Sequence, residues 1–466
     1  MNEKKQPAPQ PARPSSRPQQ MQWSVLEQQV ARMQMQITQA CQRGDRQAVH
    51  SLQQRLMESE AARLLAVHKA AEENQGKHTA GVDGVKSLSQ SERVAMAALI
   101  HPRHWKQQLP MPVRRVWMPK PGTTERRPLA ILPMIDRCKQ ALVKLALEPE
   151  WETQFEPHSY GFRPGRGTHD AIAAILVAIE GRPTYVFDAD IEGAFDHVNQ
   201  AAVLEKLQTY PALKNMIKAW LGAGVMDGDN FIPTKTGIAQ GGVLSPLLMN
   251  VALHGMEAIV AGGSGGEQPL LVRYADDFVI LHSNLSVLQQ AIRRVKRWLG
   301  TLGLQVHANK TRITHTLISY EGQVGFDFLG FHIHQEQAGR NEARGAQPHR
   351  VKTIIAPSQE AVRRHMAVLD QKLAQLQMAP QAQVIKTLNP IIAGWATYYS
   401  GVVPAATLSQ FDEMLEQRLL RWAGKRHPGK AREWLLNRYW QPVGRQQRVF
   451  ATHDRAQLRA YRLVGT

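Results

Sequence analysis

Two apolar segments of the chain carry aspartates that could do chemistry. Residues 184–191 (TYVFDADI) hold Asp188 and Asp190, and residues 270–281 (LLVRYADDFVIL) hold the adjacent Asp276 and Asp277. Alternate residues of a strand share a face, so Asp188 and Asp190 would point the same way. A buried carboxylate is costly unless it is paired or bound to metal. The second segment alone fits a polar hairpin turn with both acids in solvent equally well.

A shared site becomes the better interpretation if Asp190 lies beside Asp276 and Asp277. Three carboxylates at one sheet surface repel one another unless a divalent cation neutralises them. Hard oxygen ligands suit Mg²⁺, which keeps its waters and shares substrate phosphates. Two such ions can activate a 3′-hydroxyl and stabilise a leaving pyrophosphate. The residues therefore predict phosphoryl or nucleotidyl transfer on a nucleic acid.

The elements that must position these acids form an α+β pattern. Both aspartate segments are rich in Val, Ile, Phe and Tyr and are predicted to be buried strands, and residues 168–180 (THDAIAAILVAIE) are predicted to be helical. We expect one mixed sheet with helices around it across residues 75–340.

The flanking regions differ in character. Residues 1–22 contain five prolines and almost no apolar side chains, which is typical of a disordered arm. Apolar residues at helical spacing in 23–74 predict two amphipathic helices separated by Gly44. Residues 341–466 are predicted to be helical, with helices over 362–376, 384–395 and 408–422, and Pro390 is expected to kink or restart the second.

Composition points to a polyanionic partner. The 466 residues include 57 Lys+Arg and 39 Asp+Glu, a net charge of +18, and residues 415–466 alone hold 12 basic and 3 acidic side chains. Two cysteines, Cys41 and Cys138, cannot build a disulfide framework or a four-cysteine zinc site. No apolar run could span a membrane and the start lacks the apolar core of a signal peptide, so we expect a cytoplasmic, nucleoid-associated bacterial protein with no membrane partner.

Short blocks along residues 30–450 together resemble the group II intron-encoded reverse transcriptases, or maturases. Each block is weak alone, but their number and order make the resemblance specific. In chain order they are TAGVDG (79–84), PKP (119–121), RPL (127–129), SYGFRP (159–164), DIEGAFD (190–196), QGGVLSPLL (240–248), YADD (274–277), GL (303–304), NKT (309–311), FLGF (328–331) and LNPIIAGW (388–395).

The resemblance implies a right-hand polymerase of α+β class, with reverse transcriptase fingers and palm followed by an α-helical thumb. It divides the chain into a disordered arm (1–22), a helical RNA-binding extension (23–84), fingers and palm (85–340), a thumb or maturase domain (341–445) and a short basic tail (446–466). The tail is interpreted as a remnant of a DNA-binding segment.

The resemblance also implies roles for individual residues. Asp190, Asp276 and Asp277 match catalytic ligands of two Mg²⁺ ions, with Mn²⁺ as a substitute, and Ile191 joins them at the metal site. Phe195 matches a ring that lies under the sugar and excludes a 2′-hydroxyl. The deoxynucleoside triphosphate is assigned to Lys120, Arg127, Ile191, Phe195 and Gln240, and the nucleic acid to Arg163, Lys310, Lys425, Arg426, Lys430 and Arg432.

Some of these roles have a plain structural alternative. Arg163 fits a structural salt bridge as well as a template contact, and Lys310 fits a surface lysine as well as a residue near the primer end or the metals. A basic run such as that around Lys425 is usually a solvated helix face.

The chain departs from the family pattern in three places. Ile238 and Ala239 precede Gln240 where relatives usually have Thr-Pro, and Asn309 replaces a frequent Glu. The sequence ends at Thr466 without paired CxxC motifs. We therefore expect no His-Asn-His endonuclease, so that the priming 3′-hydroxyl comes from another source.

The resemblance predicts an RNA-directed DNA polymerase that also binds its parent intron RNA. Its partners would be group II intron RNA, an RNA template with a DNA primer, a DNA target and deoxynucleoside triphosphates. Its roles would be intron splicing and mobility by target-primed reverse transcription. Two alternatives remain open: a splicing cofactor without significant polymerase activity, and a domesticated reverse transcriptase serving DNA repair or phage defence.

Overall fold

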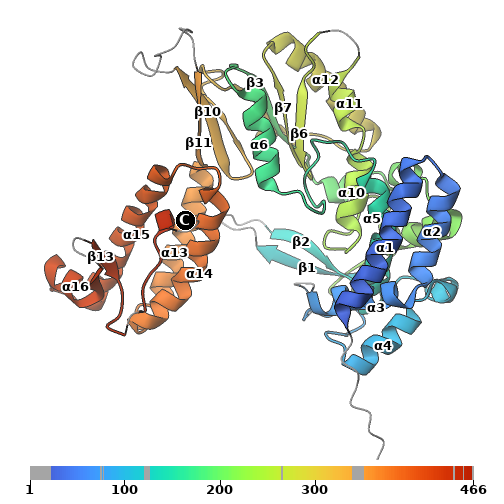
Figure 1. Cartoon of the computed structure of the whole chain (residues 1–466), viewed down its shortest axis with the longest axis horizontal. Helices are drawn as coiled ribbons and strands as arrows, with labels where there is room; N and C mark the ends of the chain where they lie inside the picture. Colours follow the sequence, from blue (N-terminus) through green and yellow to red (C-terminus); the bar gives the residue numbers. More distant parts are fainter. Residues whose placement is uncertain are drawn as a thin grey trace, which may run out of the picture.

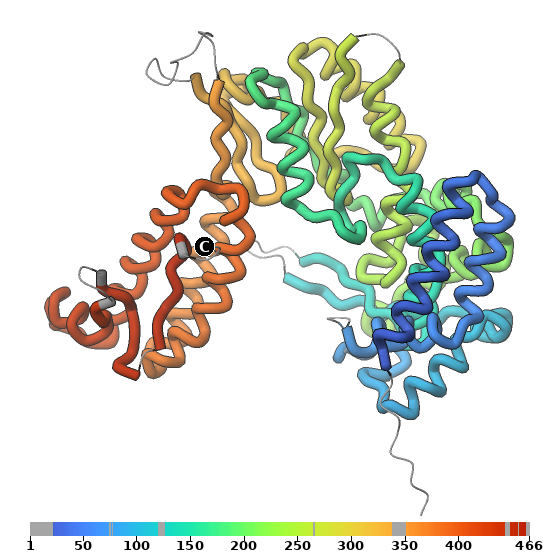
Figure 2. The backbone as a smooth tube through the Cα atoms, viewed as in Figure 1, coloured from blue at the N-terminus to red at the C-terminus, as the bar shows by residue number. Residues whose placement is uncertain are grey.

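A computed structural model describes residues 22–73, 76, 78–119, 126–263, 266–337, 351–443, 447–454 and 456–463. Figure 1 shows three parts: helices α1–α4 packed on α5, a palm sheet with α6, α11 and α12, and a separate helical thumb formed by α13–α16. The hairpin β1–β2 lies between the first part and the thumb. The tube in Figure 2 shows that the chain passes from the palm to the thumb once, through β10 and β11.

The N-terminal region contains more helices than the two predicted. Gly44 does separate α1 (Trp23–Gln42) from α2 (Arg46–Glu58), whose first turn is capped by the side chain of Asp45. Ser59, in an extended conformation, then ends α2, and α3 (Glu60–His68) follows with a π-helical turn (Lys69–Glu73). Next come α4 (Gln90–Leu99), begun by a Ser89–Glu92 capping box, and a 3₁₀ helix (Pro102–Gln107). Apolar faces of α1–α3 join the core around α5.

The fingers are built on a small mixed sheet and one buried helix. The sheet has the order β2-β1-β4-β5, in which β1 (Val113–Pro119) is antiparallel to β2 (Arg126–Ile131) and parallel to β4 (Val225–Asp227), and β5 (Asn230–Ile232) completes it. Helix α5 (Met134–Glu152) is buried on most sides. Two of its buried charged groups are paired: Asp136 accepts a hydrogen bond from Trp220, and Arg137 donates to the carbonyl of Leu132.

The palm sheet is antiparallel throughout, which corrects the expectation of one mixed sheet. Its order is β6-β7-β3-β8, formed by β6 (Leu270–Tyr274), β7 (Asp277–His282), β3 (Tyr185–Asp190) and β8 (Arg312–His315). The segment LLVRYADDFVIL is thus a hairpin rather than one strand. One face, with Phe187 and Phe278, packs into the core shared with α12; the other, with Val186 and Val279, packs into the core shared with α6.

Helices complete the palm on both sides of the sheet. The predicted helix at 168–180 is confirmed as α6 (Thr168–Ile179), and α12 (Leu285–Thr301) covers the other face. The remaining helical elements are α7 (Ala194–His197), α8 (Gln200–Leu207), α9 (Pro211–Leu221), α10 (Ser245–Leu253), α11 (Met256–Ala261) and a 3₁₀ turn (Ala308–Lys310).

The thumb contains the three predicted helices as α13 (Gln359–Gln375), α14 (Gln381–Ser400) and α15 (Ala405–Arg426), followed by α16 (Arg432–Tyr439). Helix α14 runs through Pro390 without restarting. Residues 341–466 are not wholly helical, because β11 (Val351–Pro357) pairs with β10 (Phe331–Gln337), which also pairs with β9 (Phe326–Phe328). A hairpin of β12 (Trp440–Val443) and β13 (Gln447–Phe450) and a 3₁₀ turn (Tyr461–Leu463) close this domain.

Candidate active site

The structure brings Asp190, Asp276 and Asp277 together at one end of the palm sheet. Asp190 ends β3 and lies directly opposite Asp277, which begins β7. Paired residues of an antiparallel ladder project to the same face, so these two side chains are neighbours. Asp276 belongs to the β6–β7 turn, where its carbonyl accepts a hydrogen bond of 3.2 Å from the amide of Ile191. Residues 86 positions apart therefore form one acidic cluster.

The acidic cluster is electrostatically strained. Loss of surrounding water, followed by the like charges of Asp276 and Asp190, raises the pKa of Asp277 to about 7, although this residue still exposes part of its surface. Burial and the charge of Asp190 also raise the pKa of Asp276, while the positive charges of Arg127 and Lys310 oppose that rise. A cation bound between these groups would relieve the repulsion.

The ammonium group of Lys310 supplies a positive charge at one of these carboxylates. Its Nζ lies 2.5 Å from Oδ2 of Asp190, and this hydrogen bond raises the pKa of the lysine. Among the described residues, no three His, Cys, Asp or Glu side chains form a ready-made metal cage. The all-oxygen donor set nevertheless fits Mg²⁺, because that ion keeps several waters and takes only one or two protein carboxylates beside substrate phosphates.

Asp188 lies on the same face but has a different partner. Its Oδ2 is 3.3 Å from Nε of Arg312, the residue paired with it on β8. Burial raises the pKa of Asp188 to about 6 against the opposing charge of Arg312. Asp188 is therefore paired with Arg312 within the sheet, whereas Asp190, Asp276 and Asp277 form the acidic cluster.

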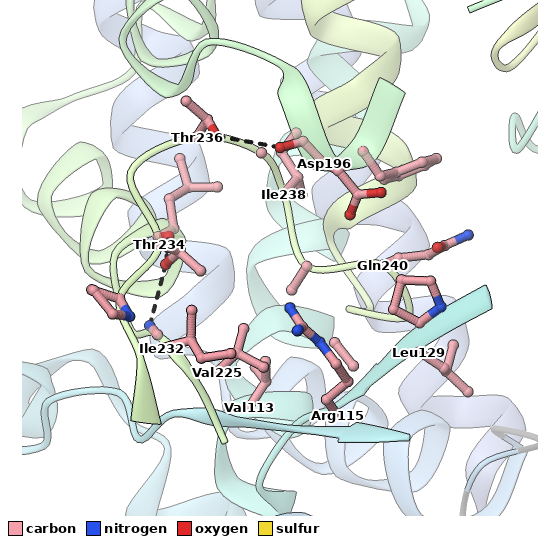
Figure 3. Close-up of a pocket in the computed structure, with 18 of the residues that line it drawn as sticks. Val113, Arg115, Leu129, Asp196, Val225, Ile232, Thr234, Thr236, Ile238 and Gln240 are labelled. Carbon is pink, nitrogen blue, oxygen red and sulfur yellow. Dashed lines mark hydrogen bonds between the residues drawn. The ribbon is translucent and has the colours of Figure 1, made fainter. Parts of the chain in front are cut away.

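A cavity of about 410 Å³ lies between the fingers sheet and α7. Phe195 and Gln240, both assigned to the nucleotide, contribute to its wall. Figure 3 shows Arg115 from β1 and Asp196 from α7 on opposite sides of this space. The loop carrying Gln240 packs closely on β2: a Cβ added to Gly241 would lie 2.8 Å from the carbonyl oxygen of Ala130, so only glycine fits there.

Three family descriptions match this chain. "Reverse transcriptase (RNA-dependent DNA polymerase)" covers residues 118–333, "N-terminal domain of reverse transcriptase" covers 19–100, and "Group II intron, maturase-specific domain" covers 363–440. The protein YkfC of Escherichia coli is 30% identical over 329 residues, which are 61% of this chain and 82% of YkfC. The chain belongs to the group II intron reverse transcriptase/maturase family.

A second relative agrees with that assignment. The group II intron-encoded protein LtrA of Lactococcus lactis is 24% identical over 402 residues, 69% of this chain and 66% of LtrA. A solved apo telomerase from Candida tropicalis aligns with a TM-score of 0.39 and 15% identity, over 48% of this chain and 53% of that one. The family matches show a reverse transcriptase with an α+β polymerase domain and a helical maturase domain. Among the described residues, no helix is both long and apolar enough to cross a bilayer.

One of the two basic residues assigned to the triphosphate, Arg127, lies on the fingers hairpin. Arg127 is exposed on β2, and its charge acts on Asp276. Lys120 lies outside the described residues. Ile191 is buried directly after Asp190, and its amide donates to the carbonyl of Asp276 in the β6–β7 turn.

Arg163 is not available to a template, which corrects its assignment to nucleic acid. Its side chain is buried, its Nη2 lies 2.9 Å from Oε2 of Glu152, and its Nη1 donates to the carbonyls of Glu156 and Ser159. The alternative of a structural salt bridge therefore describes this residue. The arginine fastens the 159–164 segment to the end of α5.

The predicted basic residues of the thumb divide into two kinds. Lys425, Lys430 and Arg432 are exposed, although Lys430 lies over the ring of Trp434 and Arg432 is 3.8 Å from Glu416. Arg426 is half-buried, donates to the carbonyls of Gln377 and Ala379, and stacks on Trp422. Only the first kind presents an exposed charge to a ligand.

The residues that pack behind the β6–β7 turn are not among those that the sequence predicts for the site. Arg273 is fully buried and contacts Asn250, Ser159 and the carbonyl of Ala275. One feature of the sequence could have indicated this role: an arginine stands inside an otherwise apolar strand segment, LLVRY. Burial of its cation lowers the pKa of Arg273 only to about 10, so it stays charged at neutral pH.

Proposed function

We propose that this reverse transcriptase extends a DNA primer on an RNA template at the acidic end of the palm sheet. Asp190, Asp276 and Asp277, with Ile191 beside them, hold two Mg²⁺ ions, for which Mn²⁺ can substitute. The observation that carries this proposal is the register that sets Asp190 opposite Asp277, one residue from Asp276. Bound there, the metal would supply the Lewis acid that activates a 3′-hydroxyl and neutralises leaving pyrophosphate.

The chain's own side chains prepare that site. Lys310 holds its proton on Nζ against Asp190 and keeps that carboxylate oriented. Arg127, with Lys120, binds the triphosphate by charge. Gln240 and Phe195 form the wall against which the nucleotide sugar packs.

Substitution of one ligand tests the assignment. Asp276→Ala should abolish primer extension while leaving affinity for an RNA–DNA duplex nearly unchanged. Asp229→Asn, at an exposed position in the β4–β5 turn, is the matched control and should extend primers normally. Retained extension by Asp276→Ala would refute the site.

The position of Phe195 makes a separate prediction about sugar selection. The ring projects from α7 into the wall of the 410 Å³ cavity. Phe195→Val should increase incorporation of ribonucleotides relative to deoxynucleotides, measured as a ratio of kcat/KM values. Unchanged selectivity would remove Phe195 from the nucleotide site.

A second activity, assistance to group II intron splicing, is favoured by the maturase-specific match at 363–440 and by the exposed cations of α15 and α16. We propose that residues 23–84 and the thumb, 341–445, bind the intron RNA, with residues 85–340 as the polymerase. Intron mobility into a DNA target would then use the same RNA-bound protein. Splicing assistance should survive Asp276→Ala, because it requires binding and no chemistry.

The N-terminal RNA surface is best tested by surface charge. Deleting residues 23–74 would expose the core around α5, because Val30, Leu56 and Leu65 are buried in it. Glutamate at the exposed Arg32, Arg43 and Arg55 should instead weaken intron RNA binding without unfolding. Unchanged RNA affinity and splicing would remove this surface from the proposal.

A further inference from the structure

A buried arginine supports the turn that carries the catalytic aspartates. Arg273 is the last residue but one of β6, two residues before Ala275, and its side chain has no exposed surface. Nη1 donates to Oδ1 of Asn250 at 3.0 Å and to the carbonyl of Ala275 at 3.1 Å, and Nη2 donates to Oγ of Ser159 at 2.7 Å. All three of these hydrogen-bond acceptors are uncharged, although the carboxylates of Glu156, Glu257 and Asp276 also act on the guanidinium through their charge. Burying a cation on neutral acceptors costs more than an apolar side chain would, so strand packing alone does not explain it.

The turn itself has an unfavourable backbone conformation that needs support. Ala275 has φ 59°, a left-handed value that non-glycine residues seldom adopt. The carbonyl of Ala275 belongs to the rigid peptide plane that extends to the nitrogen and Cα of Asp276. A donor that fixes this carbonyl therefore also fixes the direction in which Asp276 leaves the turn.

The same network connects the turn to two other elements. Asn250, on α10, accepts from Arg273 and donates to the carbonyl of Gly161 at 2.8 Å. Gly161 packs directly on the turn, because a Cβ added there would lie 2.4 Å from the nitrogen of Ala275. The amide of Tyr160 also donates to the carbonyl of Arg273. We name Arg273, Asn250, Ser159 and Gly161 the turn clamp.

We propose that Arg273 is a positioning residue for polymerisation, which sets the metal-binding geometry of Asp276 and Asp277 through the turn clamp. This inference depends on the proposed role of those aspartates as metal ligands. It assigns no contact with substrate to Arg273. Outer-shell partners of metal ligands commonly change metal affinity or activity about 10–100-fold when they are mutated.

The test is the Mg²⁺ dependence of primer extension. Arg273→Lys keeps the charge but loses the planar guanidinium, whose two terminal nitrogens reach Asn250, Ser159 and Ala275. We expect kcat at low Mg²⁺ to fall about 10-fold or more, the half-saturating Mg²⁺ concentration to rise about 3–10-fold, and high Mg²⁺ to restore part of the rate. The KM for deoxynucleotide at saturating Mg²⁺ and the affinity for an RNA–DNA duplex should stay unchanged, because Phe195 and Gln240 lie on other elements.

Arg294→Lys is the matched control. Arg294 also donates to main-chain carbonyls, including that of Ile259 at 3.0 Å at the end of α11, but the structure gives it no bond to the turn. Its variant should show wild-type Mg²⁺ dependence whatever stability it loses. An equal shift in Arg294→Lys would make the effect one of general stability and overturn the inference.

A milder variant keeps the test decisive if Arg273→Lys does not fold. Ser159→Ala removes one acceptor of the turn clamp and should shift the Mg²⁺ requirement in the same direction by about 2–3-fold. Normal Mg²⁺ dependence in Ser159→Ala, or in a folded Arg273→Lys, overturns the positioning role. Such a result leaves the polymerase site standing if Asp276→Ala is inactive, whereas an active Asp276→Ala refutes the proposed function itself.

Discussion

The palm site and the core of the thumb both contain titratable groups with shifted pKa values, but the neighbours of these groups differ. In the palm, like charges crowd together and raise the pKa of Asp277 to about 7. In the thumb, burial lowers the pKa of His365 to about 4, while its Nε2 lies 2.6 Å from the hydroxyl of Tyr461 and its ring stacks on Trp395. The thumb group has its partners within the protein. The palm group has like-charged neighbours, which is what a site that awaits a cation requires.

Asp277→Asn gives the largest expected effect and tests the palm side of the comparison. Primer extension should fall by about 10³-fold or more, because a neutral amide is a poor ligand for Mg²⁺. Stability without metal should change in the opposite direction. Because the folded-state pKa is raised, the folded protein binds the extra proton between about pH 4 and 7, so the ionised cluster loses stability as pH rises through that window.

The melting temperature of Asp277→Asn should therefore exceed that of the wild type above pH 7, and this gain should disappear near pH 4. Melting curves in chelator at several pH values measure it. Asp229→Asn, exposed and remote from the cluster, should show neither change. A lower melting temperature for Asp277→Asn at pH 8 would mean that the cluster is not self-repelling.

Tyr461→Ala tests the thumb side. Tyr461 is completely buried against His365, Trp395 and Phe411. Truncating an aromatic ring in such a core costs about 3–5 kcal/mol, which should unfold the thumb first. Hydrogen exchange of α13 and α15 should accelerate while the palm strands stay protected. Arg459→Ala, two residues away and exposed, is the control, and equal loss of protection in both variants would contradict this packing.

The thumb should also be sensitive to acid in a defined window. His365 has a lowered folded-state pKa, so the unfolded chain binds more protons between pH 6.5 and about 4 and stability falls as pH drops through that range. The loss from this one group is up to about 3 kcal/mol. Arg418 adds to the shift, since its positive charge opposes protonation of the ring. His365→Gln, which keeps a polar partner for Tyr461, should flatten the acid side of the stability curve, and an unchanged curve would exclude this residue as its source.

The two regions also differ in how much the sequence predicted. Helical periodicity was enough for α6 and α13–α15, since each buries one regular apolar face. The meeting of Asp190 with Asp276 and Asp277 followed from two apolar strands that each carry acids. The sequence does not decide whether LLVRYADDFVIL is one strand or a hairpin, because a buried strand and a buried hairpin have the same composition.

The missed features depend on long-range contacts. The partners of Arg273 are 23 and 114 positions away, and no local pattern predicts them. Arg163 looks like any basic residue of a nucleic-acid-binding protein until Glu152 is seen beside it. Strand β11 lies in a region predicted to be helical. Its strand conformation depends on pairing with β10, which its own residue pattern does not reveal.

The smallest expected effect separates two neighbouring cations of the thumb. Lys425→Gln removes an exposed charge and should weaken RNA affinity a few-fold, reduce the salt slope of binding by about 1, and leave the melting temperature unchanged. Arg426→Gln also removes donors to the carbonyls of Gln377 and Ala379 and the stack on Trp422, so it should lower thumb stability by about 1–2 kcal/mol. Binding at several salt concentrations together with melting curves distinguishes them. Equal losses of stability and of RNA affinity in the two variants would contradict this prediction. They would mean that Lys425 and Arg426 do not differ in whether they bind RNA or stabilise the thumb.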